Sequence, residues 1–286
     1  MQRRHVLAGF GLAAAACAAP AWVRAQSARA DGYRFSPVNQ YGLQLTATYW
    51  NPLIEHVSAV SGVKLTLKIG RTSADTTSYV LAQEVDFAFT NHLFSPERER
   101  MGWKVLGRRD APPVQGQLAV LDESPVHKLA QLADAEVGFP GPEAFVSYKV
   151  PYAHLLAEKV PVRVVFGGNM DSALTQLVNG KVAAVGGNSQ LIEGFAKRES
   201  RRLRVLWSSE AFHELALMCS PRVPAADVDA VRRAFIGMAA DAKGRAVLES
   251  ASKAVALAKA SGFVRASDSD YDNYRRFYAS APAQLR

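Results

Sequence analysis

The side chains best suited to hold a small solute follow short apolar segments that resemble strands. Hydroxyl, amide and imidazole groups donate and accept hydrogen bonds without a fixed charge. Where strands alternate with helices, ligands bind in the loops at the carboxyl ends of the strands. These loops supply the candidate ligand-binding residues, which are Gln40, Tyr41, Thr72, Ser73, Thr90, Asn91 and His92 in the first half of the chain, and Glu143, Ser147, Tyr148, Asn169, Asn188 and Ser189 in the second.

Several of these candidates also have an ordinary structural role. Asn91 and Asn188 could simply end strands, and Ser73 and Asn169 could cap helices. Glu143 could bind an amine of a ligand, or it could only favour the dipole of a helix that starts beside it. The residue types alone leave these alternatives open.

Two segments with the same pattern position many of the candidates. Residues 68–92 and 165–189 align without a gap at an offset of 97. The matching pairs include Gly70 with Gly167, Val85 with Val182 and Asn91 with Asn188. Each segment resembles a strand, a polar cap, an amphipathic helix and a second short strand. A unit that occurs twice at domain-sized spacing predicts two similar lobes rather than a solenoid, which needs at least three repeats.

Strand-like and helix-like segments alternate along the chain, which predicts mostly parallel sheets. The clearest helix is 43–61, where apolar side chains recur at spacings of three and four and Gly62 follows as a stop. Further helices are expected over 142–158 and over the alanine-rich stretch 224–262.

The expected fold is therefore α/β, with two similar doubly wound lobes joined by a two-strand hinge. Residues 33–118 together with 216–286 would form lobe 1, and residues 119–215 would form lobe 2. The chain would cross between the lobes near 116–121 and 213–219, and these crossings would act as the hinge. A cleft between such lobes is a common site for a small ligand.

Composition supports a folded chain and gives little reason to expect a nucleic-acid partner. The sequence has 286 residues, 49% of them hydrophobic, and a formal net charge of +8. The densest basic run, 197–204, has no interleaved aromatic side chains, which favours a solvated helix end over a nucleic-acid patch.

Residues 1–25 have the pattern of an export signal. Arg3 and Arg4 precede an apolar run, and a small-x-small cleavage pattern ends at Ala25. The paired arginines resemble the twin-arginine signal. Cys17 leaves lipid anchoring open as an alternative to cleavage after Ala25. We expect a periplasmic protein.

Chemistry other than binding has weak support in the sequence. His213, Met218 and Cys219, with His92, could be drawn as a soft-metal site, but their spacing matches no known motif. Cys219 is expected to be a buried strand residue. The chain has no Gly-x-Ser-x-Gly elbow. We expect no catalytic residue, no metal and no cofactor, and keep a small-metabolite enzyme on the same fold as a distant alternative.

Four blocks carry a resemblance to a known family. They are Trp-Asn-Pro-Leu at 50–53, Val-Asp-Phe-Ala-Phe at 85–89, Phe-Gly-Gly-Asn-Met-Asp-Ser-Ala at 166–173 and the segment 263–271. The chain resembles the periplasmic solute-binding proteins of phosphonate, phosphite and phosphate uptake systems. The resemblance implies a type II periplasmic-binding-protein fold, a monomer that closes over its ligand, and an ABC permease as the partner.

The chain departs from this family where the family binds a phosphoryl group. Relatives carry Ser-Thr-Ser-Gly-Tyr-x-x-Pro at a helix start, and this chain has Ala-Phe-Val-Ser-Tyr-Lys-Val-Pro at 144–151. Met170 stands where relatives place a histidine. By this correspondence Phe145 and Met170 join the candidate ligand-binding residues. A ligand that is less charged or more apolar than a typical phosphonate is expected.

A membrane sensor is a second partner that the sequence allows. A histidine kinase, like a permease, could recognise the closed conformation of the two lobes. Both partners remain open at this point.

Overall fold

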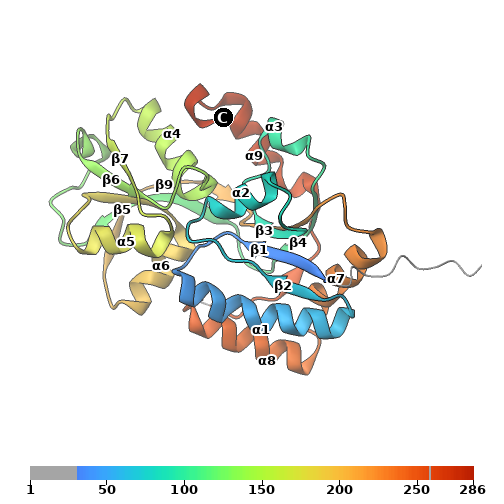
Figure 1. Cartoon of the computed structure of the whole chain (residues 1–286). Coiled ribbons are helices and arrows are strands. Elements are labelled where there is room, and N and C mark those ends of the chain that lie inside the picture. The colour runs from blue at the N-terminus through green and yellow to red at the C-terminus, as the bar shows by residue number, and fades with distance from the viewer. Residues whose placement is uncertain (1–30, 258) are drawn as a thin grey trace, which may run out of the picture.

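The computed structural model describes residues 31–257 and 259–286, which form two β-sheets with helices on both faces of each (Figure 1). The first sheet has the strand order β11-β4-β10-β3-β1-β2, and the second has the order β7-β6-β8-β5-β9. The strands of the first sheet are β1 (Tyr33–Pro37), β2 (Leu65–Leu67), β3 (Phe87–Thr90), β4 (Lys104–Arg109), β10 (Ala216–Cys219) and β11 (Phe263–Val264). Those of the second are β5 (Val114–Leu121), β6 (Glu136–Phe139), β7 (Arg163–Phe166), β8 (Ala184–Asn188) and β9 (Leu203–Phe212).

The two sheets share one local arrangement. Strand β1 pairs in parallel with β2 and β3, and β6 pairs in parallel with β7 and β8. Helix α2 (Asp75–Leu81) connects β2 to β3, as α5 (Met170–Val178) connects β7 to β8. The repeated sequence therefore corresponds to two equivalent βαβ units, and the expected α/β fold of two similar doubly wound halves is confirmed.

Close packing explains why both units of the repeat have a glycine at the same position. A Cβ atom built on Gly70 would lie 2.1 Å from Cβ of Asp75, and one built on Gly167 would lie 2.6 Å from the amide nitrogen of Ala173. In both units the loop after the strand passes too close to the next helix for any side chain.

The chain passes between the sheets twice, at 110–113 and at 213–215. Strand β5 lies wholly in the second sheet, because it pairs antiparallel with both β8 and β9. The first passage therefore precedes the expected segment 116–121, and the second begins the expected segment 213–219.

Helices cover both faces of each sheet (Figure 1). On one face of the first sheet lie α1 (Leu43–Ser61), α7 (Ala225–Gly237) and α8 (Ala242–Ala254), and on the other lie α2 and α9 (Asp272–Ser280). In the second sheet α5 and α6 (Ser189–Arg198) cover one face and α4 (Val150–Ala157) covers the other. The short α3 (Pro96–Glu99) follows β3.

Two expected helices are wrong in extent. The stretch 224–262 is broken, because α7 ends at Gly237 and Asp241 caps a separate α8 by accepting a hydrogen bond from the amide of Gly244 (2.7 Å). The stretch 142–158 opens with a π-helical turn over Phe145–Lys149 before α4. Pro151 has no amide hydrogen to donate, which disfavours a regular α-helix through this turn.

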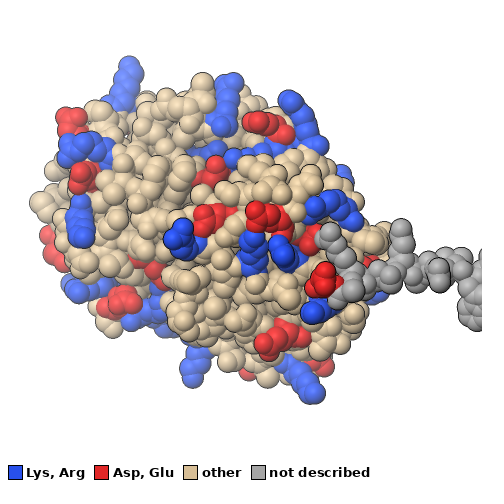
Figure 2. Space-filling view, in the orientation of Figure 1, with Lys and Arg blue, Asp and Glu red and all other residues tan. Residues whose placement is uncertain are grey.

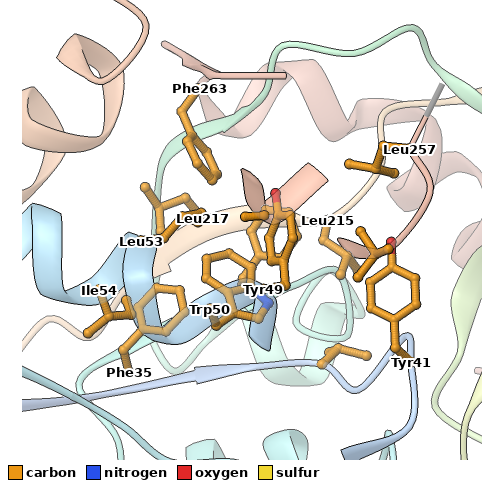
Figure 3. Close-up of a cluster of buried hydrophobic side chains, with 14 of the residues drawn as sticks. Phe35, Tyr41, Tyr49, Trp50, Leu53, Ile54, Leu215, Leu217, Leu257 and Phe263 are labelled. Atoms are coloured by element: carbon orange, nitrogen blue, oxygen red, sulfur yellow. The ribbon is translucent and has the colours of Figure 1, made fainter. Parts of the chain in front are cut away.

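Aromatic side chains fill the core between α1 and the first sheet (Figure 3). The ring of Trp50 lies 5.0 Å from those of Phe35 and Phe89, measured between ring centres. Most apolar positions of 43–61 face this core, as their spacing predicts, but Leu43 and Val60 at the two ends are exposed. Gly62 ends the helix with φ near +70°.

The surface carries both signs of charge. On the face in Figure 2, basic and acidic side chains are interspersed. None of the helices within residues 31–257 and 259–286 combines the length and the apolar character that crossing a bilayer requires. The expected export signal at 1–25 lies outside the described residues.

Cys219 lies buried in β10, as the sequence predicts, and burial raises the pKa of its thiol to about 11. Only the thiolate is strongly nucleophilic, so the folded protein should react very slowly with a thiol reagent at neutral pH.

We predict that a Cys17→Ala variant, whose remaining cysteine is Cys219, reacts with a chromogenic disulfide reagent at pH 7 only after unfolding in guanidinium. The absorbance change with time, in buffer and in denaturant, measures this. Stoichiometric reaction within seconds in buffer would contradict the buried thiol.

Candidate functional site

A small cavity lies where the carboxyl ends of β1 and β3 meet those of β6 and β8, and it measures about 40 Å³. A water molecule needs roughly 10–15 Å³ of such volume, so the cavity has room for about three. Candidate residues from both halves line it, namely Gln40, Ser73, Asn91, His92, Phe145, Ser147, Met170 and Asn188.

The other candidates lie outside the cavity lining and contact other residues instead. Thr90 accepts a hydrogen bond from the amide of His92 (3.0 Å), Asn169 caps α5 by accepting from Ser172 (2.9 Å), and Ser189 accepts from the amide of Gln115 (3.1 Å). Thr72 bonds to Asp75, Tyr148 stacks on Tyr152, Glu143 pairs with Arg98, and Tyr41 lies buried 5.8 Å from the guanidinium of Arg198. Asn188 both lines the cavity and caps α6.

Two polar residues of the lining, Asn39 and Glu214, were not among the residues predicted from the sequence. Asn39 stands beside the candidate Gln40, and Glu214 lies within the second crossing. A charged residue in a segment expected to pass between two lobes was the available signal for Glu214.

The wall from the second half is largely apolar. Ala144, Phe145, Val146 and Met170 all line the cavity and are buried. The ring of Phe145 stacks on Tyr274 of α9, with ring centres 4.0 Å apart. The residues expected to replace a set of polar ligands therefore meet at one site.

Glu214 gives the cavity its charge, since no lysine or arginine of the described chain lines it. The carboxylate is 7% exposed. It accepts a hydrogen bond from Gln40, and its Oε2 lies 3.3 Å from Nη1 of Arg109, which is buried behind it. Arg109 thus partly balances the charge of Glu214 without reaching the cavity lining.

Two further lining atoms have no hydrogen-bond partner within residues 31–257 and 259–286. They are Oδ1 of Asn39 and Oγ of Ser73, and both side chains are buried. Oδ1 of Asn39 is an acceptor, and a serine hydroxyl donates or accepts. Together with Glu214 they favour a solute that supplies N–H or O–H donors.

His92 is held neutral, because burial lowers the pKa of its imidazole to about 3. Its Nδ1 is 2.8 Å from the hydroxyl of Thr77. It therefore offers the cavity a neutral ring rather than a positive charge.

The two halves touch around the cavity. The amide of Ser73 donates to the carbonyl of Gly168 (2.7 Å), and the amide of Gly42 donates to Oδ2 of Asp171 (3.2 Å). Arg98 donates to both carboxylate oxygens of Glu143. These contacts join the two halves directly beside the cavity.

His92 and Cys219, two candidates for a soft-metal site, have separate surroundings. His92 bonds to Thr77, and Cys219 is protonated and buried. Within the described part of the chain, no three His, Cys, Asp or Glu side chains are grouped so as to hold a metal ion.

A protein-family model matches the chain. The model described as the periplasmic substrate-binding protein of phosphonate ABC transporters matches residues 35–271, which is most of the chain. No curated protein sequence matches the chain.

Solved structures resemble the fold at low sequence identity. A binding protein component of an ABC phosphonate transporter from Pseudomonas aeruginosa superposes with a TM-score of 0.73 at 17% identity, covering 86% of this chain and 85% of that one. The PhnD1 protein of Prochlorococcus marinus, solved with methylphosphonate, gives 0.71 at 13%, covering 85% and 95%. An arginine transport periplasmic binding protein from Legionella pneumophila gives 0.53 at 13%, covering 76% and 98%. At these identities the likenesses show the fold alone.

We predict that His92 lowers stability in acid. The unfolded imidazole binds a proton below about pH 6.5, whereas the folded one binds it only near pH 3, so unfolding becomes easier as pH falls between these values. At pH 5 the loss should be about 2 kcal/mol.

Urea unfolding at pH 7 and pH 5 measures this effect. His92→Gln, which keeps a polar side chain but cannot titrate, should lose this part of the pH dependence, and His127→Gln, at an exposed position, should behave as the parent. Equal pH dependence in the parent and His92→Gln would contradict the neutral imidazole.

Proposed function

The chain belongs to the family of periplasmic substrate-binding proteins of phosphonate ABC transporters, and from this we propose that it captures a small solute between two lobes and delivers it to an ABC permease. Lobe 1 would comprise residues 33–118 and 216–286, and lobe 2 residues 119–215. The members of this family are binding proteins rather than enzymes.

One observation carries this proposal. The candidate residues that line the cavity come from both sheets, with Asn91 at the end of β3 and Asn188 at the end of β8. A solute held there contacts both halves only while they are closed, so binding favours the closed form. A permease that recognises this form would distinguish loaded from empty protein.

The solute is proposed to lack a phosphonate or other strong acid group. A charge-assisted hydrogen bond contributes on the order of 1.5–3 kcal/mol, and a buried anion without such bonds loses its hydration uncompensated. The cavity offers an anion the apolar Ala144, Val146 and Met170 beside the carboxylate of Glu214. A small neutral or amine-bearing solute with N–H or O–H donors suits these groups better.

The proposed partner is an ABC permease in the inner membrane, and the protein would act as a monomer after export by a twin-arginine signal. The matching family model describes binding proteins of ABC transporters, so we do not propose the sensor-kinase alternative further.

We predict that methylphosphonate, phosphite and phosphate give no saturable heat at micromolar concentration in calorimetric titration, because Ala144, Phe145, Val146 and Met170 supply no side-chain hydrogen bond to an anion and the carboxylate of Glu214 repels it. Micromolar binding of any of the three would overturn the proposed ligand class.

A matched variant tests whether these side chains are what excludes the anion. Ala144→Ser, Val146→Ser and Met170→His together would restore polar groups and leave the ring of Phe145 in place. Methylphosphonate should then bind at least tenfold more tightly, because about 1.4 kcal/mol, less than one charge-assisted hydrogen bond, is tenfold in affinity. No gain in a folded variant would mean that the lost hydroxyls are not what excludes the anion.

We also predict that a thermal-shift screen of small solutes selects neutral or amine-bearing compounds with hydrogen-bond donors. A solute at 100 times its Kd should stabilise the protein by about 2.7 kcal/mol. Glu214→Gln should lose most of the shift, and Glu123→Gln, at an exposed position, should keep it. Selection of carboxylates or phosphonates that Glu214→Gln still binds would contradict the prediction.

A further inference from the structure

Helix α9 lies between the two halves of the molecule, beside α3 on one side and α4 on the other (Figure 1). An ion pair and an aromatic stack hold it against the first half. Nε of Arg275 is 2.5 Å from Oε1 of Glu99, and the rings of Phe94 and Tyr271, which immediately precedes the helix, stack with centres 4.4 Å apart.

Further contacts of α9 reach the second half. The ring of Phe145 stacks on Tyr274 at 4.0 Å and meets Phe277 edge-on at 4.9 Å. The side-chain amide of Asn273 donates to the carbonyl of Ala211 in β9 (3.2 Å). One short helix therefore bonds to both halves at once.

Tyr274 is the residue of α9 that touches the cavity lining from both sides. Its hydroxyl accepts a hydrogen bond from Nδ2 of Asn91 (3.1 Å) and donates to the carbonyl of His213 (2.5 Å). Its ring stacks on Phe145. Asn91 lines the cavity from the first half and Phe145 lines it from the second, and Tyr274 is fully buried between them.

We propose that Tyr274 is a positioning residue that couples Asn91 to Phe145 and so holds the halves closed around the binding cavity. The proposal rests on the proposed function, because it assigns a role to α9 in closing that same site. Tyr274 positions the residues that meet the solute and does not itself line the cavity.

Separation of the halves would preserve some contacts of α9 and break others. Separating the halves leaves the pairs of Arg275 with Glu99 and of Tyr271 with Phe94 intact, because they lie within the first half. It breaks the stack of Tyr274 on Phe145. An aromatic pair resists such separation beyond the area it buries. The stack would therefore make separation of the halves less frequent, and α9 would set how often the 40 Å³ cavity becomes accessible.

The residue type at position 145 affects both the cavity wall and the contact with α9. The resemblance over 144–151 implies a hydroxyl residue there in relatives, whereas here the ring of Phe145 packs on α9. The same substitution removes a polar ligand from the cavity wall and supplies the second half of an aromatic contact.

Three variants separate the contributions, all studied without solute so that the outcome does not depend on a ligand. Phe145→Leu removes the stack, Tyr274→Phe keeps the ring and removes the hydroxyl, and Tyr271→Phe is the control. Tyr271 is a buried tyrosine beside α9 whose stacking partner, Phe94, lies in the first half.

Small-angle X-ray scattering and amide hydrogen exchange provide the readouts. Phe145→Leu should increase the radius of gyration. It should also speed amide exchange over 145–149 by about 2- to 12-fold, the factor that corresponds to the free energy of one aromatic pair. Tyr274→Phe should keep the closed radius and speed exchange around Asn91. Tyr271→Phe should match the parent in both.

Exchange in β5 distinguishes loss of closure from loss of fold, because this strand lies inside the second sheet. Faster exchange at 145–149 with unchanged exchange in β5 supports the proposal. A uniform rise that includes β5 would mean that the stack serves stability alone, and it would overturn the positioning role. An unchanged radius with unchanged exchange in Phe145→Leu would overturn it as well.

Discussion

Parallel pairing inside each half is the constraint on which the candidate binding site depends. Strands β1 and β3 run parallel, as do β6 and β8, so each pair ends at one edge of its sheet. Two passages of the chain, at 110–113 and 213–215, set these edges against each other. Side chains that are far apart in the sequence, such as Asn91 and Asn188, thereby meet at a single cavity.

The charge of the cavity depends on which ionisable side chains line it and which lie behind its wall. Arg109 approaches Glu214 from behind and is nearly fully buried, so its charge moderates the carboxylate without being offered to a solute. His92 adds a neutral ring. The wall from the second half is apolar at 144–146 and at Met170, and the only carboxylate among the described lining residues, that of Glu214, disfavours an acid group.

Closure of the halves involves more of the chain than the two passages between them. The carbonyl of Gly168, the carboxylate of Glu143 and the ring of Phe145 each bond to the first half or to α9. The sequence analysis assigned Glu143 to a ligand or a helix dipole, and the structure pairs it with Arg98. A salt bridge between residues 45 positions apart has no local pattern from which it could be predicted.

The sequence by itself determined the two similar α/β halves and many of the residues at their strand ends, because strand alternation, helix spacing and the close approach of Gly70 and Gly167 to the next helix are local properties. Only the tertiary structure decided which strand-end side chains face the cavity. It turned Tyr148 away in a π-helical turn, brought Glu214 in from a crossing, and placed Tyr274 of the final helix against Asn91 and Phe145. These positions depend on packing between distant segments, which no local pattern encodes.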